Sequence, residues 1–204
     1  MTTESDSDGK LLQVLERARA VGFLGPGPLR VHLDSARGFA AALPEGATRL
    51  VDLGTGGGVP ALPLLAGAAE VRGILVEAMA KRATFLTWAV AELGLRHRVD
   101  VVRDRAEVAG HDPALRGSAD VVTARGFGPP ALTAECAVGF LRVGGWLIVS
   151  EPPDERHRWP TDGLAPLGLG PAERRGSFVR LQLVAAPPSG MPRPTRHLVK
   201  RPLF

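Results

Sequence analysis

Cysteine is almost absent, because the chain of 204 residues contains only Cys136 and so cannot form an internal disulfide bridge. Cys136 stands in an apolar helical pattern, which favours a buried core thiol over a nucleophile. The five histidines show no spacing typical of metal ligands, and we therefore expect no metal site.

Long apolar runs are also missing, since no uninterrupted stretch reaches the length of a membrane-spanning helix. The first residues are acidic and polar, which is the opposite of a signal peptide. With 45% hydrophobic and 23% charged residues, the composition is that of a globular chain of one domain. We expect a cytoplasmic protein, without membrane contact, that acts as a monomer.

Positive charge is in slight excess, with a net charge of +4. The excess is concentrated near the carboxyl end, where residues 171–204 contain six arginines and one lysine against the single acid Glu173. Such a basic segment is compatible with contact to nucleic acid.

A glycine-rich stretch, residues 51–60, organises the rest of the sequence. The apolar residues before it end in Asp52, and Gly54, Gly56 and Gly58 follow at intervals of two. This order predicts a strand, a tight turn whose backbone needs angles open to glycine, and then a helix with Pro60 in its first turn. Val59 stands where the dinucleotide-binding pattern G-x-G-x-x-G/A requires Gly or Ala, which argues against a nicotinamide cofactor.

The pattern D-x-G-x-G-x-G resembles the first motif of the class I S-adenosylmethionine (SAM) methyltransferases. In that family the acid and the glycine backbone hold the methionine end of SAM, and an acid that ends the second strand holds the ribose hydroxyls. Here the apolar residues 71–76 lead into Glu77, nineteen positions after Gly58. The resemblance therefore implies SAM as the cofactor and Glu77 as the ribose ligand.

Strand and helix patterns alternate along the chain, which predicts a parallel sheet covered by helices on both faces. We expect strands at 49–53, 71–76, 98–102, 119–124 and 146–149, with helices at 10–24, 31–43, 61–69, 81–93 and 131–141 and a turn at Gly144-Gly145. Residues 178–185 and 196–200 are predicted to form an antiparallel closing pair. The fold class is thus α/β, a Rossmann-like class I methyltransferase with a mostly parallel seven-stranded sheet. We expect a disordered tip over 1–9, a short N-terminal helical extension over 10–46 and the methyltransferase domain over 47–204.

Several short motifs together resemble the RsmG (GidB) family, which methylates N7 of a guanine in 16S ribosomal RNA of the small subunit. These motifs are His32-Leu33-Asp34-Ser35, Asp52 to Pro60 with Leu62-Pro63-Leu64, Lys81-Arg82 with Phe85-Leu86, Arg105-Ala106-Glu107, Asp120 to Arg125, and Arg201-Pro202-Leu203. The resemblance implies transfer to an N7 atom that carries a lone pair and no proton, so that no general base is needed.

The resemblance also implies roles for individual residues. Arg125 would lie beside the reacting guanine as the catalytic residue, where a guanidinium can bond O6 and phosphate oxygens. Phe127 would stack on a base or pack in the core, and Lys81 and Arg82 would contact phosphate or lie on a solvated face. The cofactor-binding candidates are Asp52, Gly54, Thr55, Gly56, Gly58, Glu77, Asp104, Arg105, Ala106 and Glu107, of which Asp104 and Ala106 would flank the adenine and Glu107 has a helix cap as its alternative role.

Two other functions remain open at this point. The same fold could methylate a small molecule, with Glu151 facing a cationic or hydroxylated acceptor, or it could be a non-catalytic SAM-binding or RNA-binding protein. The basic carboxyl-terminal segment favours 16S rRNA or the small ribosomal subunit as the partner, whereas Glu151 favours the small molecule.

Overall fold

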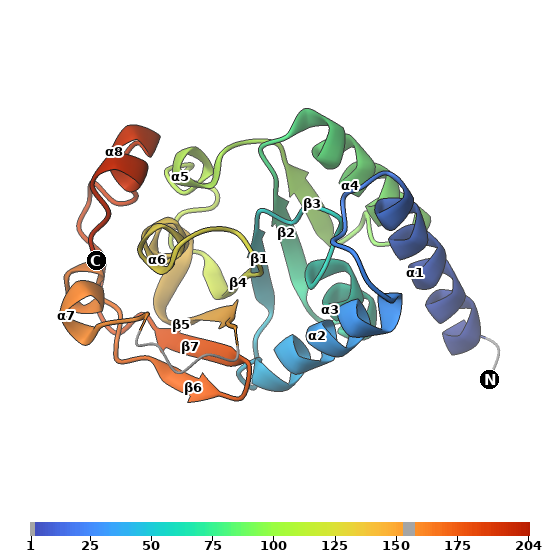
Figure 1. Ribbon diagram of the computed structural model, residues 1–204, viewed down its shortest axis with the longest axis horizontal. Coiled ribbons are helices and arrows are strands. Elements are labelled where there is room, and N and C mark those ends of the chain that lie inside the picture. Colours follow the sequence, from blue (N-terminus) through green and yellow to red (C-terminus); the bar gives the residue numbers. More distant parts are fainter. Residues whose placement is uncertain (1–2, 153–157) are drawn as a thin grey trace.

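The computed structural model describes residues 3–152 and 158–204 of the chain. Its centre is a seven-stranded sheet in the order β3-β2-β1-β4-β5-β7-β6 (Figure 1). The first five strands are parallel and β7 and β6 are antiparallel to their neighbours, which confirms the expected mostly parallel sheet. The strands are β1 (Arg49–Leu53), β2 (Arg72–Val76), β3 (Val99–Val102), β4 (Ala119–Ala124), β5 (Leu141–Ser150), β6 (Glu173–Arg175) and β7 (Phe178–Gln182).

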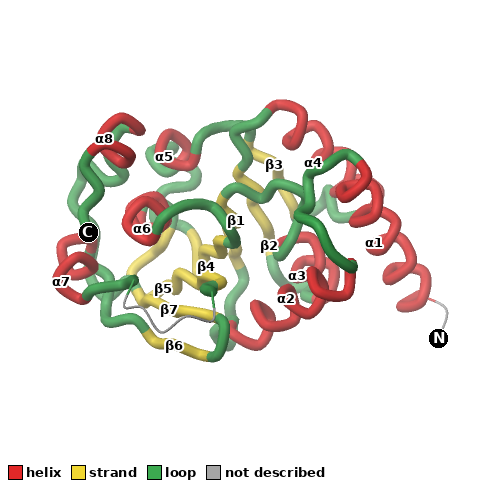
Figure 2. The backbone as a smooth tube through the Cα atoms, in the orientation of Figure 1, coloured by secondary structure: helices red, strands yellow, loops and turns green. Residues whose placement is uncertain are grey.

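Helices cover both faces of this sheet, as Figure 2 shows in red around the yellow strands. One layer contains α1 (Thr3–Ala20), α2 (Leu29–Ala42), α3 (Ala61–Gly67) and α4 (Ala80–Glu92). The other contains α5 (Ala106–Ala109), α6 (Pro130–Val138), α7 (Thr161–Leu164) and α8 (Thr195–Lys200), with the short 3-10 helix η1 (Ala165–Leu167). In the described part of the chain, no helix combines the length and the apolar character needed to cross a membrane.

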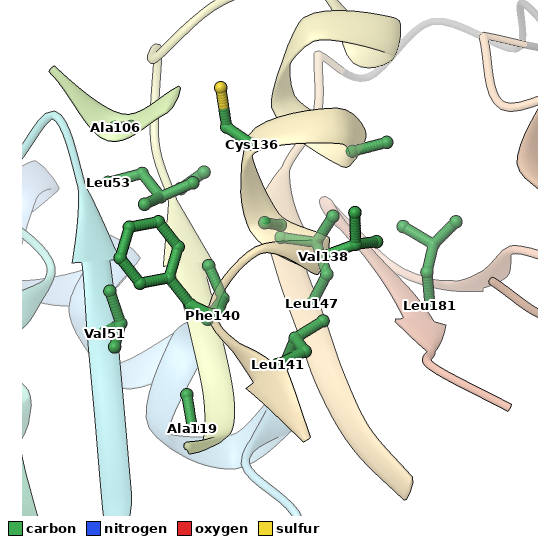
Figure 3. Close-up of a cluster of buried hydrophobic side chains, with 14 of the residues drawn as sticks. Val51, Leu53, Ala106, Ala119, Cys136, Val138, Phe140, Leu141, Leu147 and Leu181 are labelled. Atoms are coloured by element: carbon green, nitrogen blue, oxygen red, sulfur yellow. The ribbon is translucent and has the colours of Figure 1, made fainter. Parts of the chain in front are cut away.

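The strands separate the core into two clusters because successive side chains point to opposite faces. In β1, Val51 and Leu53 join the cluster under α5 and α6, whereas Leu50 joins the cluster under α1 to α4. The close-up of the first cluster shows Val51 and Leu53 beside Phe140 from the segment after α6 (Figure 3). Burial on both faces explains why the central strands are continuous apolar runs in the sequence.

The amino-terminal helices α1 and α2 pack on the same face of the sheet as α3 and α4. Val14, Leu15, Ala36 and Phe39 are buried in the cluster that they share with those helices. Helix α1 begins at Thr3, within the range expected to be a disordered tip, and residues 1 and 2 lie outside the described part.

The strand β5 is longer than the sequence predicted. It begins at Leu141 and runs through Gly144 and Gly145, which we expected to form a turn, and the helix expected over 131–141 ends at Val138. A Cβ on Gly145 would lie 2.9 Å from the backbone oxygen of Ala119, and the pairing of β4 with β5 shifts register at this point. Glycine therefore allows a bulge inside the strand instead of ending it.

The antiparallel pair that closes the sheet consists of β6 and β7, and the strand predicted over 196–200 is wrong. Residues 195–200 form helix α8, which buries Leu198 against the core. The three residues of β6 are all exposed and charged, as is common in edge strands. Such a strand has no apolar alternation, and the sequence therefore gave no signal for it.

Asp120 ties together the amino ends of three neighbouring strands. Its Oδ2 accepts hydrogen bonds from the backbone N–H of Thr48 and of Arg49, both at 2.8 Å, and its Oδ1 accepts one from Arg142 Nε at 2.6 Å. Burial by itself would raise the pKa of Asp120, but the hydrogen bonds from Arg142, Thr48 and Arg49 outweigh it and lower the pKa to about 2.

We predict that Asp120→Asn lowers the free energy of unfolding by about 2 kcal/mol at neutral pH. A carboxyl whose pKa is lowered by folding stabilises the protein above its unfolded pKa, and this contribution is lost as the pH falls toward the folded value. The deficit of the variant, measured by denaturant unfolding, should therefore be level from about pH 7 to about pH 4 and shrink as the pH falls from about 4 toward about 2. Asp100→Asn, which alters an exposed side chain of β3, serves as the control, and a deficit independent of pH would contradict the prediction.

Candidate functional site

The glycine turn joins the end of β1 to α3. Gly54, Gly56 and Gly58 have φ angles of +63°, +59° and +97°, in the left-handed region that other residues rarely adopt. A Cβ on Gly54 would lie 2.7 Å from Cδ2 of Phe127, so the turn is also in close contact with the segment after β4. The N–H groups of Gly54 and Thr55 both donate to the Val76 carbonyl, which fixes the turn against the end of β2.

Glu77 lies at the end of β2 with only 4% of its surface exposed. Its Oε2 accepts from Gly56 N at 2.9 Å and its Oε1 from Met79 N at 2.8 Å. An ionised carboxylate offers about four lone-pair positions, so each oxygen can still accept a hydrogen bond from a ligand hydroxyl. These remaining acceptor positions fit the hydroxyl groups of a ribose.

A pocket of about 170 Å³ opens at the carboxyl ends of β1, β2 and β3. Six of the residues predicted for the site line it, namely Gly54, Glu77, Arg82, Asp104, Ala106 and Phe127. Val76, Ala78 and Gly126, which were not predicted, complete the wall. The strand order reverses between β1 and β4, and ligands of open α/β sheets bind at such a point, outside the carboxyl ends of the strands.

Other predicted residues lie beside the pocket rather than in its wall. Glu107 is buried and bonds its own neighbours: Arg105 Nε donates to its Oε1 at 2.5 Å, and the Thr195 hydroxyl of α8 donates to the same oxygen. The hydrogen bond between Thr195 and Glu107 therefore links α8 to α5. Lys81 is exposed at the start of α4.

Asp52 lies beneath the glycine turn with 1% of its surface exposed. It is paired in register with Thr123 of β4, whose hydroxyl donates to Asp52 Oδ1 at 2.5 Å, and the Thr55 hydroxyl donates to the Asp52 backbone oxygen at 3.1 Å. Burial raises the pKa of Asp52 to about 7, against the opposing effects of Thr123, Thr55 and Arg125. A nearby cation would favour the ionised form.

Arg125 follows β4 directly and is half-buried. Its Nη2 lies 2.7 Å from Nδ1 of His32 on α2, across 93 positions of sequence. The sequence showed His32 only as part of a motif, and no local pattern could have predicted this contact.

Three other observations concern groups that the sequence offered as possible reactive or metal-binding side chains. Glu151 is buried and accepts from Arg158 Nη1 at 2.8 Å, so the carboxylate considered for a small-molecule acceptor already has a cationic partner. Cys136 is buried in the core, and burial raises the pKa of its thiol. The described residues contain no group of three or more histidine, cysteine or acidic side chains that could hold a metal ion.

A second, larger hollow of about 460 Å³ lies between α1, α2 and α3. It is lined mainly by apolar residues such as Leu12, Leu33 and Leu64, and its lining includes neither the glycine turn nor Glu77. The smaller pocket at the strand ends contains the polar groups that a SAM-like ligand requires, and we take it as the candidate site.

Solved structures share this architecture. An O-methyltransferase from Bacillus cereus, in complex with SAH, superimposes with a TM-score of 0.62 at 18% identity over 85% of this chain and 90% of that one. A SAM-dependent methyltransferase from Aquifex aeolicus gives 0.57 at 18% identity, over 83% and 98%. The fold is that of the class I SAM-dependent methyltransferases.

The chain belongs to the family described as rRNA small subunit methyltransferase G (GidB), whose model matches residues 29–152. A protein named ribosomal RNA small subunit methyltransferase G from Roseiflexus castenholzii is 38% identical over 186 residues, which cover 86% of this chain and 79% of that protein. Its namesake from Rubrobacter xylanophilus is 32% identical over 210 residues, covering 95% and 80%. The family expected from the motifs, and SAM as its cofactor, are confirmed.

We predict that Asp52→Asn changes the dependence of stability on pH. Because folding raises the pKa of Asp52 from 3.8 to about 7, the wild-type carboxyl favours the folded state most at low pH, and this contribution is lost as the pH rises through about 7. The asparagine variant does not ionise and should gain a few degrees in melting temperature relative to wild type between about pH 5 and about pH 8. Thermal unfolding across that range checks the prediction, and a difference that is constant with pH would disprove it.

Proposed function

We propose that this enzyme transfers the methyl group of SAM to N7 of a guanine in 16S ribosomal RNA, and that it does so without a general base. The observation that carries the proposal is the match of residues 29–152 to the small-subunit rRNA methyltransferase family. The Arg125 guanidinium, at the point where the strand order reverses, supports it. Such a substrate would place the enzyme in the cytoplasm, and we expect it to act as a monomer.

The cofactor would be held by the residues that converge on the pocket. We assign the ribose hydroxyls to Glu77, the adenine to the wall formed by Asp104 and Ala106, and the methionine end to the glycine turn above Asp52. SAM supplies an electrophilic methyl group on a positively charged sulfur. The positive φ of the three glycines lets the backbone approach such a ligand without a Cβ between them.

The absence of a general base follows from the acceptor atom. Guanine N7 has a lone pair and no proton, so methylation at N7 leaves no proton to remove. Of the described residues that line the pocket, none is a histidine or a cysteine, and we assign its two carboxylates, Glu77 and Asp104, to the cofactor. The chain therefore contributes mainly alignment of the two reactants, which can be worth roughly 7–11 kcal/mol.

The RNA would be held by cations around the pocket. A guanidinium such as that of Arg125 can bond guanine O6 or phosphate oxygens in a fork. Arg82 lines the pocket and Lys81 is its exposed neighbour, which suits them to phosphate contacts. Phe127 packs on the glycine turn with its ring partly exposed, so a base that enters the pocket could stack on it.

The first test is a transfer assay with labelled SAM and three acceptors: small subunits that lack the modification, naked 16S rRNA and a small-molecule extract. We expect label at a guanine N7 of the RNA, and loss of most of it in Arg125→Ala. RNA affinity should also fall steeply between about 50 and about 200 mM salt. Label only in small molecules would disprove the proposed acceptor.

The cofactor assignment has a separate test. Glu77→Ala removes the ribose acceptor, and Asp52→Ala removes the carboxyl beneath the turn; each should weaken SAM binding by about tenfold or more, as measured by calorimetry. Glu92→Ala, at the far end of α4, is the matched control and should bind as wild type does. Unchanged affinity in both site variants would show that SAM binds elsewhere.

A further inference from the structure

The Arg125 guanidinium is held by a histidine in a single tautomer. His32 has 4% of its surface exposed, and its Nε2 lies 3.2 Å from the Gly25 carbonyl oxygen. A carbonyl oxygen only accepts hydrogen bonds, so Nε2 must carry the proton. Nδ1 is then the lone-pair nitrogen, and it accepts from Arg125 Nη2 at 2.7 Å.

This contact is the main restraint on the guanidinium. Among the described residues it is the one side-chain hydrogen bond that Arg125 makes, and the Arg125 Nη1 atom is buried without a partner. Burial lowers the pKa of Arg125, and the nearby Asp52 raises it. Without an acceptor at His32 Nδ1, little else in the described structure would fix the direction of this side chain.

His32 also connects Arg125 to the loop over the glycine turn. Gly25 belongs to residues 21–28, which join α1 to α2. In the same loop Leu24 and Phe23 are in close contact with the glycine turn. A Cβ on Gly57 would lie 2.7 Å from Leu24 Cδ2 and 2.8 Å from the Phe23 carbonyl oxygen. One imidazole ring therefore bridges the loop that covers the turn and the arginine at the end of β4.

We propose that His32 is a positioning residue for methyl transfer, whose neutral ring fixes the Arg125 guanidinium at the carboxyl end of β4. With Nη2 bound to His32, Nη1 is left for an oxygen acceptor that the described residues do not supply, of the kind that a base carbonyl or a phosphate offers. This inference rests on the proposed function, because it assigns the acceptor to the RNA.

The arrangement requires that His32 stay uncharged. A protonated ring has no lone pair for Arg125, and it would face the positive charges of Arg125, directly after β4, and of Arg19 on α1. Burial first, then Arg125, lowers the pKa of His32 below 6.5, with Arg19 acting in the same direction and the Gly25 carbonyl opposing them. Activity should therefore be level near neutral pH and fall on the acid side as His32 gains a proton.

Two substitutions test the two hydrogen bonds of the His32 ring one at a time. His32→Gln places an amide near Nε2, so it can keep the Gly25 bond and lose the Arg125 bond. His32→Asn places an amide oxygen near Nδ1, so it can accept from Arg125 without titrating. We expect kcat on RNA to fall by about tenfold to a hundredfold in His32→Gln, with SAM affinity within about threefold of wild type. His32→Asn should recover most of kcat and lack the loss on the acid side.

Controls separate a positioning role from a structural one. His97→Gln changes an exposed histidine and should keep the wild-type rate and pH profile. In an Arg125→Lys background, His32→Gln should add little, because the two residues act as one unit. Equal activity of His32→Gln and wild type would overturn the inference, as would equal impairment of both His32 variants together with weaker SAM binding.

A measurement without substrate distinguishes failure of this inference from failure of the proposed function. Nitrogen-15 NMR of labelled histidine, assigned through His32→Asn, should show a neutral ring protonated at Nε2 at neutral pH. If that pattern is found but no RNA is methylated, the proposed acceptor is wrong and the His32–Arg125 contact stands. A charged ring, or a proton on Nδ1, would overturn the inference whatever the substrate.

Discussion

β1 pairs in parallel with β2 on one side and with β4 on the other. Because these strands run in one direction, the turn after β1, Glu77 after β2 and Arg125 after β4 all emerge at the same edge of the sheet. The strand order reverses between β1 and β4, so the connections diverge there and leave room for a ligand. The site depends on this pairing, because its groups come from separate parts of the chain and only the paired strands bring them together in space.

The same edge contains polar groups that are buried more deeply than polar groups usually are. Asp52 and His32 both lie near Arg125, and burial shifts the pKa of each of the three groups in the direction that favours the neutral form: upward for the acid and downward for the two bases. Buried groups of this kind need partners, and Thr123, the Gly25 carbonyl and the Arg125–His32 contact provide them. A cationic ligand above the turn would favour ionised Asp52, so the binding of such a ligand and the protonation of this acid would be coupled.

In the layer that contains α5 and α6, buried carboxylates bind the carboxyl-terminal segment of the chain. Glu135 of α6 accepts from the backbone and the guanidinium of Arg193, and Glu107 of α5 accepts from Thr195 and Arg105. Of the seven cations in residues 171–204, Arg180 and Arg193 are partly buried, whereas the other five are exposed, namely Arg174, Arg175, Arg196, Lys200 and Arg201. Net charge by itself cannot separate arginines that hold the fold, such as Arg193, from those that face solvent.

The alternation of strands and helices, the glycine turn, and the position of Glu77 at the end of the second strand could be predicted from the sequence, because apolar periodicity and glycine spacing are local properties of the chain. Six residues that were predicted from the sequence as site residues also line one pocket in the structure, namely Gly54, Glu77, Arg82, Asp104, Ala106 and Phe127. Three features became visible only in the folded chain: Glu107 binds Thr195, residues 195–200 form a helix, and His32 contacts Arg125. Each of these depends on contacts between segments far apart in the chain, where the residue pattern of one segment contains no information about its partner.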